Sequence, residues 1–358
     1  MRMSARISVA AAVSVVTALA FMTPTPANAA THHTFVVHPG QSIQKAVDAA
    51  AAGDTVVVKA GTYVQSVAIA KDGLTLRADG RVTISPPATL GGCSAPGEEM
   101  GICVIPADVN PDTGAYTNRV KNVTVTGFRV KGFQGNGVFG YGTDHVRFSH
   151  LRAENNTIYG IVNFDGRFTT ISDNATSGSD EAGLYVGDAP DAHSVVRDNR
   201  SWNNALGILV RHTHRVTVVD NTIYGNCMGV YLLDDTQPGG SGDNVMRDNT
   251  VNANNKSCPG FPDEGVPPFS GAGIVLEGSQ HNLIVDNEVN RNRGTTAVSG
   301  GIVFRTAGNG KGASFNNVRD NELHGNRPAD IVKDATSVGN RFVDNECHSS
   351  VPKRLCHH

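Results

Sequence analysis

A repeated Asp-Asn pair, placed after a short apolar run and before a polar turn and a glycine, constrains this chain most. The pair stands at Asp173-Asn174, Asp198-Asn199, Asp220-Asn221, Asp248-Asn249, Asp286-Asn287, Asp320-Asn321 and Asp344-Asn345, with Glu154-Asn155 as a near copy. Repeats of roughly 20 to 40 residues are typical of solenoids, propellers and other arrays. We expect the pairs to be structural, with asparagine amides that hydrogen-bond from one repeat to the next.

Residues 1–29 have the pattern of a secretory signal peptide. Two arginines precede an apolar run over residues 7–22, and Ala27-Asn28-Ala29 fits a cleavage site. We therefore expect a secreted domain over residues 30–358, without a later membrane span. The formal net charge of -3 does not favour nucleic acid or an anionic membrane as a partner.

The six cysteines form pairs that are close in the sequence. In an exported protein such pairs favour structural disulfides, although sequence alone does not fix their connectivity. The expected pairs are Cys93 with Cys103, Cys227 with Cys258, and Cys347 with Cys356. No cysteine and histidine spacing suggests a zinc site.

The first part of the expected domain alternates strands with one helix. Ser42 can cap a helix whose apolar residues Ile43, Ala46, Val47 and Ala50 follow helical spacing, and such a helix can cover the open end of a solenoid. Expected strands lie at residues 34–37, 55–59, 67–69 and 74–77. Residues 86–118 interrupt the pattern and suggest an inserted lobe. Smaller insertions are expected at residues 254–271 and 306–314, in loops beside a binding face.

Two stretches resemble secreted right-handed parallel β-helix proteins. They are HPGQSIQKAVDAAAAGDTVVVKAGTYVQSVAIAKDGLTLRADG (residues 38–80) and GLYVGDAPDAHSVVRDNRSWNNALGILV (residues 183–210). The resembled superfamily includes pectate-lyase-like enzymes, uronan epimerases and NosD-type carbohydrate-binding and sugar-hydrolysis repeats. The resemblance implies an all-β, single-stranded, right-handed parallel β-helix with a short N-terminal capping helix. It does not decide the activity, because these repeats occur in enzymes and non-enzymes alike.

Alignment of the repeats on one glycine predicts which side chains stack in columns along the solenoid. The glycines are Gly137, Gly160, Gly183, Gly207, Gly229, Gly273 and Gly301. The following residues should point inward: Val138, Ile161, Leu184, Ile208, Val230, Ile274 and Ile302. Two columns should point outward: Phe139, Val162, Tyr185, Leu209, Tyr231, Val275 and Val303, and then Tyr141, Phe164, Gly187, Arg211, Leu233, Glu277 and Arg305.

Ionisable residues gather where these strands end. The strand-end column is Gly142, Asp165, Asp188, His212 and Asp234, with Asp235 and His214 nearby. The catalytic candidates are Asp165, Asp188, Arg211, His212 and Asp234, and the substrate-binding candidates are Tyr141, Phe164, Tyr185, Tyr231, Glu277 and Arg305. Titratable groups beside aromatic faces suit a groove that binds a polysaccharide. Taken singly, an aspartate at a strand end is more often a turn residue than a catalyst, and a lone histidine there is more often a surface or turn residue.

Three functions compete for this groove. Lyase-like β-elimination or C5 epimerisation of a uronan would use Arg211 or Arg305 to neutralise a carboxylate, and His212, Tyr185 or Tyr231 as base or acid. The sequence lacks the Asp-x-His-Asp signature of uronan epimerases and the Lys/Arg signature of pectate lyases.

Inverting hydrolysis is the second option, since residues 163–166, Gly187-Asp188 and His212 resemble, in order, three polygalacturonase motifs, although key parts of them are missing. A non-catalytic carbohydrate-binding or surface protein is the third. The only cofactor suggested is Ca²⁺ beside Asp188, Asp234 and Asp235, where no regular ligand spacing supports it.

Overall fold

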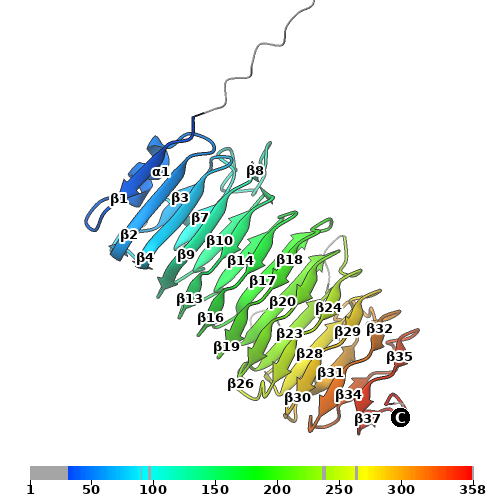
Figure 1. Ribbon diagram of the computed structural model, residues 1–358. Coiled ribbons are helices and arrows are strands. Elements are labelled where there is room, and N and C mark those ends of the chain that lie inside the picture. Colours follow the sequence, from blue (N-terminus) through cyan, green and yellow to red (C-terminus); the bar gives the residue numbers. More distant parts are fainter. Residues whose placement is uncertain (1–30, 90, 96–97, 236–238, 263–264, 357–358) are drawn as a thin grey trace, which may run out of the picture. The chain divides into compact units, whose positions relative to one another are not determined.

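The computed structural model describes residues 31–89, 91–95, 98–235, 239–262 and 265–356. The expected signal peptide and its cleavage site lie outside these ranges. His32–His358 form one compact unit, in which the chain winds through successive coils of parallel strands (Figure 1). No helix in the described ranges is long and apolar enough to cross a membrane.

One face of the solenoid is an 11-stranded parallel sheet. Its strands, in spatial order, are β3 (Val67–Ile69), β7 (Ile102–Val104), β10 (Val138–Tyr141), β14 (Ile161–Phe164), β17 (Ala182–Ala189), β20 (Leu206–Thr213), β23 (Met228–Leu233), β28 (Ala272–Glu277), β31 (Gly300–Arg305), β34 (Ile331–Lys333) and β37 (Ser350–Val351). This sheet carries the predicted columns.

A 20-stranded sheet forms the rest of the wall and has two limbs. It begins with β1 (Thr34–Val37), β2 (Thr55–Val64), β4 (Thr75–Ser85) and β9 (Thr124–Lys131). The first limb then comprises β12 (Arg147–Ser149), β15 (Thr170–Ser172), β18 (Val195–Arg197), β21 (Thr217–Val219), β24 (Val245–Arg247), β29 (Leu283–Val285), β32 (Asn317–Arg319) and β35 (Arg341–Val343). The second limb comprises β13 (Arg152–Glu154), β16 (Ala175–Ser177), β19 (Arg200–Trp202), β22 (Thr222–Tyr224), β25 (Thr250–Asn252), β30 (Glu288–Asn290), β33 (Glu322–His324) and β36 (Glu346–Cys347). The limbs meet at β9, which pairs with both β12 and β13.

Short pairs lie outside the two sheets. They are β5 (Ser94–Ala95) with β6 (Glu98–Glu99), β8 (Val120–Lys121) with β11 (Thr143–Asp144), and β26 (Ser257–Cys258) with β27 (Phe269–Ser270). The helix α1 spans Ile43–Ala49, and its predicted cap is confirmed because Ser42 Oγ accepts a hydrogen bond from the Lys45 amide at 3.2 Å. Ile43 and Val47 are buried in the core.

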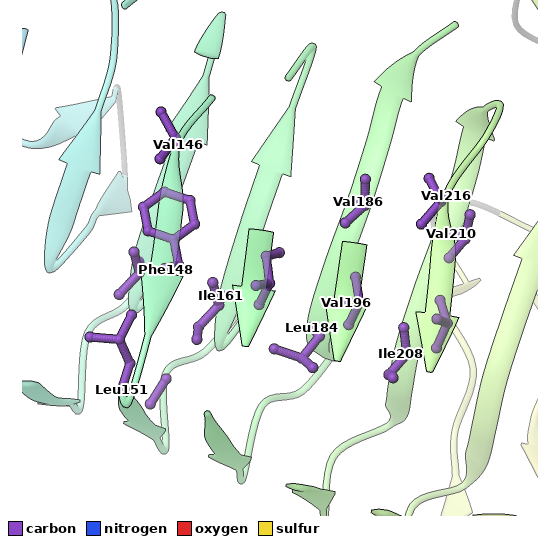
Figure 2. Packing of buried hydrophobic residues seen from close by; sticks show 14 of the residues in the cluster. Val146, Phe148, Leu151, Ile161, Leu184, Val186, Val196, Ile208, Val210 and Val216 are labelled. Atoms are coloured by element: carbon purple, nitrogen blue, oxygen red, sulfur yellow. The ribbon is translucent and has the colours of Figure 1, made fainter. Parts of the chain in front are cut away.

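The inward column of the 11-stranded sheet forms part of the core, as predicted. Register pairs join Val138 to Ile161, Ile161 to Leu184 and Leu184 to Ile208, and all four side chains are fully buried. Figure 2 shows Ile161, Leu184 and Ile208 among the buried hydrophobic residues of successive coils. Burial of a side chain of this size stabilises the folded state by about 1.5–3 kcal/mol.

The Asn residues of the Asp-Asn pairs form the predicted ladder. The Nδ2 of each donates to the Oδ1 of the next, at 2.9–3.0 Å, from Asn174 through to Asn345. The preceding aspartates have φ between 50° and 59°, a left-handed conformation that aspartate tolerates well. Two further ladders, unpredicted, run through Asn204, Asn226, Asn254, Asn292 and Asn326, and through Asn282, Asn316 and Asn340.

The interpretation of Glu154-Asn155 as a copy of the pair is wrong. Glu154 lies in register with Ser177, beyond the corner that Asn174 occupies. On the coil before Asn174, the ladder position is occupied by Leu151, whose backbone amide donates to Asn174 Oδ1 at 2.9 Å. Sequence similarity of the dipeptide was misleading, because the corner is set by strand register.

The three disulfides are those expected: Cys93–Cys103, Cys227–Cys258 and Cys347–Cys356. Apart from Asn254, which stays in its ladder, the described residues of the insertions at 254–271 and 306–314 leave the regular coils, and Cys258 ties the first insertion to the sheet. The lobe expected over residues 86–118 is only partly an excursion. Within it, β7 is a regular strand between β3 and β10, because Ile102 and Val104 are fully buried in the core.

Candidate active site

The strand-end column of the 11-stranded sheet lies at a sharp corner. Phe164 is in register with Gly187, and Gly187 with Arg211, so Asp165, Asp188 and His212 follow one another on successive coils. Their φ angles are 45°, 51° and 47°. Aspartate and histidine are enriched in this left-handed region, so the backbone explains part of their presence here.

A cluster of two carboxylates, an imidazole and a guanidinium forms the centre of the candidate site. His212 Nδ1 lies 3.0 Å from Asp188 Oδ1, and His212 Nε2 contacts Asp235 Oδ1. Arg211 Nη2 donates to Asp235 Oδ2 at 2.7 Å. The His212 side chain is only 2% exposed, whereas those of Asp188, Asp235 and Arg211 are 40%, 25% and 27% exposed.

This environment favours a protonated His212. Burial lowers its pKa, but the hydrogen bonds with Asp188 and Asp235 outweigh burial and raise the pKa above its ordinary value. Both ring nitrogens then donate to carboxylates. The arrangement suits an imidazolium that holds the two carboxylates in place, and it disfavours the imidazole as a general base.

The remaining catalytic candidates belong to two other ion pairs. Asp165 binds Arg119, with Arg119 Nη2 to Asp165 Oδ1 at 2.7 Å, and accepts a hydrogen bond from Tyr116. Asp234, whose side chain is 4% exposed, pairs with Lys311. The five candidates therefore fall into three charge groups along one edge.

A second polar group lies on the outer face, one to three coils beyond Arg211. Glu277 is in register with Arg305, with Arg305 Nε to Glu277 Oε2 at 3.8 Å, and it shares a hydrogen bond with Tyr231. Burial raises the pKa of Glu277, opposed by the charge of Arg305. Burial and the neighbouring Glu277 also raise the pKa of Tyr231, which keeps its hydroxyl protonated.

The aromatic candidates are less exposed than expected. Tyr185 is 1% exposed and packs edge-on against Tyr159 and Phe164, with ring centroids 5.1 and 4.9 Å apart, so the prediction of an open platform at Tyr185 is wrong. Half-buried Tyr141 donates its hydroxyl to the Gly114 carbonyl at 2.8 Å.

An outer apolar cluster explains this burial. Outward side chains of the sheet, including Val162, Leu209 and Val275, pack with Phe269 of the 254–271 insertion. The insertion therefore covers part of the face that alternation alone would leave open. Phe164 and Tyr231 lie at the margin of this cluster and remain half-buried.

The carboxylates suggested for Ca²⁺ do not form a site. Asp188 and Asp235 flank His212, and Asp234 pairs with Lys311. Over the described ranges, no group of three or more His, Cys, Asp or Glu side chains is placed to hold a metal ion.

Sequence reasoning missed Tyr116, Arg119 and Lys311, which engage Asp165 and Asp234. Tyr116 lies in the 86–118 segment, Arg119 directly follows it, and Lys311 lies in the 306–314 insertion. The only signal was that insertions of a solenoid often border its binding face. No repeat position indicated which side chains would reach the column.

Comparison with protein families gives two overlapping matches, over residues 101–239 and 136–309, to the family described as the right-handed β-helix region. Together they span more than half of the chain. The chain belongs to the right-handed β-helix family. This membership confirms the predicted handedness and fold. No curated protein sequence matches this β-helix protein significantly.

Solved structures share its fold at low sequence identity. The A-module of the Azotobacter vinelandii mannuronan C-5 epimerase AlgE4 is 17% identical, with a TM-score of 0.59, covering 85% of this chain and 90% of that one. An alginate lyase from Paenibacillus sp. str. FPU-7 is 16% identical, with a TM-score of 0.59 and coverage of 87% and 99%. The tailspike of E. coli bacteriophage HK620, solved with a pentasaccharide, is 13% identical, with a TM-score of 0.58 and coverage of 84% and 60%. At these identities the similarity shows the fold alone.

Proposed function

We propose that this protein is secreted and acts on a uronate polysaccharide that lies along the outer face of the 11-stranded sheet. The reaction is lyase-like β-elimination or C5 epimerisation. The observation that carries the proposal is the shared column of Arg211, Glu277 and Arg305, beside Tyr231 and the carboxylates that flank His212. The β-helix fold of an epimerase and an alginate lyase supports the same substrate class.

The two arginines suit a chain of carboxylated sugars. Arg211 and Arg305 stand three coils apart, which corresponds to about 14 Å along the solenoid axis. Each side chain is about a quarter exposed, so part of it is open to a ligand. A guanidinium can bind a carboxylate through two parallel hydrogen bonds.

The proposed chemistry removes the proton next to the sugar carboxylate. Asp188 or Asp235 accepts this proton, while Arg211 or Arg305 stabilises the enolate-like charge that develops on the carboxylate. In elimination, the electron pair forms a carbon–carbon double bond as the glycosidic carbon–oxygen bond breaks, and Tyr231 protonates the leaving oxygen. In epimerisation, a proton returns to the opposite face of the same carbon. His212 orients the two carboxylates.

Hydrolysis is a second candidate because of Glu277. Burial raises the pKa of this carboxyl, a property of general acids, and the charge of Asp235 raises it further. Glu277 would then protonate the leaving oxygen, and Asp235 would activate a water molecule. In this case Glu277→Gln abolishes activity, and new reducing ends appear without unsaturated sugars.

A panel of uronans and neutral glycans separates these functions. Unsaturated uronate absorbance together with new reducing ends indicates a lyase, and solvent deuterium incorporation without cleavage indicates an epimerase. Reducing ends alone indicate a hydrolase. Binding without any of these changes would refute an enzymatic role on that panel.

Variants locate the activity. Tyr231→Phe removes one hydroxyl and should lower kcat by about 100-fold or more, the usual effect of losing a positioned acid. Tyr224→Phe, on the second limb, is the matched control and should keep full activity. Asp188→Asn and His212→Ala should also abolish turnover, and full activity in both would place the site elsewhere.

A further inference from the structure

A second polar surface lies on the 20-stranded sheet and continues along its second limb, on a different sheet from the proposed active site. It begins at a hollow of about 380 Å³ lined by Arg81, Arg129, His150 and Arg152, which we call the basic hollow. Arg129 and Arg152 are neighbours in register on β9 and β13. Figure 1 shows β13, β16 and β19 following one another along this side of the solenoid.

The basic hollow retains positive charge. Glu154 binds both Arg129 and Arg152, with Arg129 Nε to Glu154 Oε2 at 2.7 Å, so one buried carboxylate is shared by two arginines. Arg81 is exposed and forms no ion pair with the described residues. The hollow is therefore lined by three guanidinium groups, of which two share one carboxylate, and the excess charge favours an anionic ligand.

An indole ring follows two coils further along the same limb. Glu154 is in register with Ser177, and Ser177 with Trp202, which places Trp202 about 10 Å along the axis from Glu154. Tyr224 stacks on one side of Trp202, with ring centroids 6.2 Å apart and planes 4° apart. On the other side the register neighbour is Ser177, whose side chain is too small to cover an indole.

Small residues stand in register with Arg200 and Trp202 on the preceding coil, and we call the surface over them the notch. The outward positions of β16 are Ala175 and Ser177, between the charged Arg152 and Glu154 of β13 and the Arg200 and Trp202 of β19. Arg200 Cζ lies 5.3 Å from the Trp202 ring centroid and 5.1 Å from that of Tyr224, and it has no acidic partner among the described side chains. The notch thus has guanidinium groups on both sides and an aromatic face at one end.

We propose that the basic hollow and the notch form a second binding site, which takes an acidic oligosaccharide. One sugar ring stacks on Trp202, and carboxylates of neighbouring sugars bind Arg152 and Arg81. Aromatic faces pack on the apolar faces of sugar rings, and guanidinium groups bind carboxylates with matched geometry. The site is independent of the proposed reaction, since none of its residues lies on the 11-stranded sheet.

Trp202 is the only tryptophan of the chain, so its fluorescence reports on this site directly. Titration with hexagalacturonate should give a saturable change in emission. Fully methyl-esterified hexagalacturonate has the same backbone without charge and should bind much more weakly. Binding should also weaken as salt is added, because the basic hollow is open to solvent.

Two variants and one control test the contacts. Arg81→Gln should weaken binding about 3- to 10-fold, the effect of losing one charge-assisted contact at a partly exposed site. Ser177→Leu fills the notch in front of the indole and should prevent binding. Arg341→Gln changes an exposed arginine of β35 and should leave the titration unchanged.

Several outcomes would overturn this inference: no change in Trp202 emission, equal binding of the esterified sugar, or equal effects of Arg81→Gln and Arg341→Gln. If sodium sulfate or monomeric galacturonate changed the Trp202 emission as much as hexagalacturonate does, the site would be a general anion site. If oligo(dT) bound more tightly than hexagalacturonate, the site would be reassigned to nucleic acid. The Asp188→Asn variant separates the two proposals, because it should lose activity yet keep the full titration.

Discussion

Asn221 gives the sharpest test of what holds the solenoid together. Its side chain is buried, and its Oδ1 accepts hydrogen bonds from the backbone amide and the Nδ2 of Asn199, both at 3.0 Å. Its own Nδ2 donates to the carbonyl oxygens of Val196 and Val219 and to Asn249 Oδ1, at 2.9–3.0 Å. One amide therefore joins three consecutive coils.

Asn221→Ala removes the acceptor of two buried N–H groups of Asn199, the backbone amide and one of the two on Nδ2, whose other hydrogen bond to the Ile171 carbonyl remains. Each orphaned donor costs about 1–3 kcal/mol, so the variant should lose about 2–6 kcal/mol of unfolding free energy. For a unit of this length the unfolding entropy is about 0.7 kcal/mol/K, which converts this loss to a fall in Tm of about 3–9 °C. Thermal unfolding followed by circular dichroism measures it.

Asn221→Asp tests the direction of the hydrogen bonds. The carboxylate can still accept from Asn199, but its other oxygen faces three acceptor oxygens where the Nδ2 stood. Burial and these oxygens should raise its folded-state pKa above the unfolded value of about 3.9. A raised folded pKa means that stability is lost as pH rises through it, so the Tm deficit relative to wild type should be larger at pH ~8 than at pH ~5.

The matched control is Asn118→Ala, at an exposed asparagine whose side chain makes no hydrogen bond with the described residues. It should change Tm by no more than about 1 °C, as expected for a surface substitution of this kind. If Asn221→Ala lowered Tm no more than this control does, the role of the ladder in stability would be refuted. The reasoning also fails if the deficit of Asn221→Asp is independent of pH.

Two further predictions concern the charge groups at the strand ends. Lys311→Ala removes the partner of the buried Asp234 carboxylate and should lower the free energy of unfolding, measured with denaturant, by roughly 3 kcal/mol. Arg319→Ala breaks an exposed ion pair and should lower it by less than about 1 kcal/mol. Equal losses in the two variants would contradict the role of burial. The pKa of His212 is raised above 6.5 in the folded state, so its stabilising contribution is complete below that pH and is lost as pH rises through the folded value. The Tm difference between wild type and His212→Gln should therefore be larger at pH ~6 than at pH ~9, and a constant difference would refute the protonated imidazole.

The repeat made the scaffold predictable. Alternation of apolar and polar residues after each glycine identified the inward column, because strand geometry leaves only two side-chain directions. The left-handed corner limits the choice of residue, and for this reason the Asp-Asn pairs mark it so consistently. The ladders through Asn204 and Asn282 were missed because their preceding residues vary, so no fixed dipeptide marks those corners.

The surface of the sheet was less predictable than its interior. The outward column includes Tyr185, and alternation gives its direction correctly, but the 254–271 insertion and neighbouring rings cover this face. Contacts such as Lys311 with Asp234 join residues 77 positions apart, and no local pattern encodes them. Arg129 and Arg152 became neighbours only through the register of β9 with β13.

Backbone geometry changes how the candidate active-site residues should be weighed. Asp165, Asp188 and His212 all occupy a left-handed corner, at φ between 45° and 51°, where glycine, asparagine, aspartate and histidine are the favoured residues. The presence of aspartate and histidine at these positions is therefore weaker evidence for catalysis than their alignment in one column first suggests. Arg211 and Tyr231 lie inside strands, where the scaffold would accept any residue that packs, and yet they bear polar groups that point to the outer face. A functional site is better indicated by residues that the fold does not require, so substitutions at Arg211 and Tyr231 should separate activity from stability more cleanly than those at the corner.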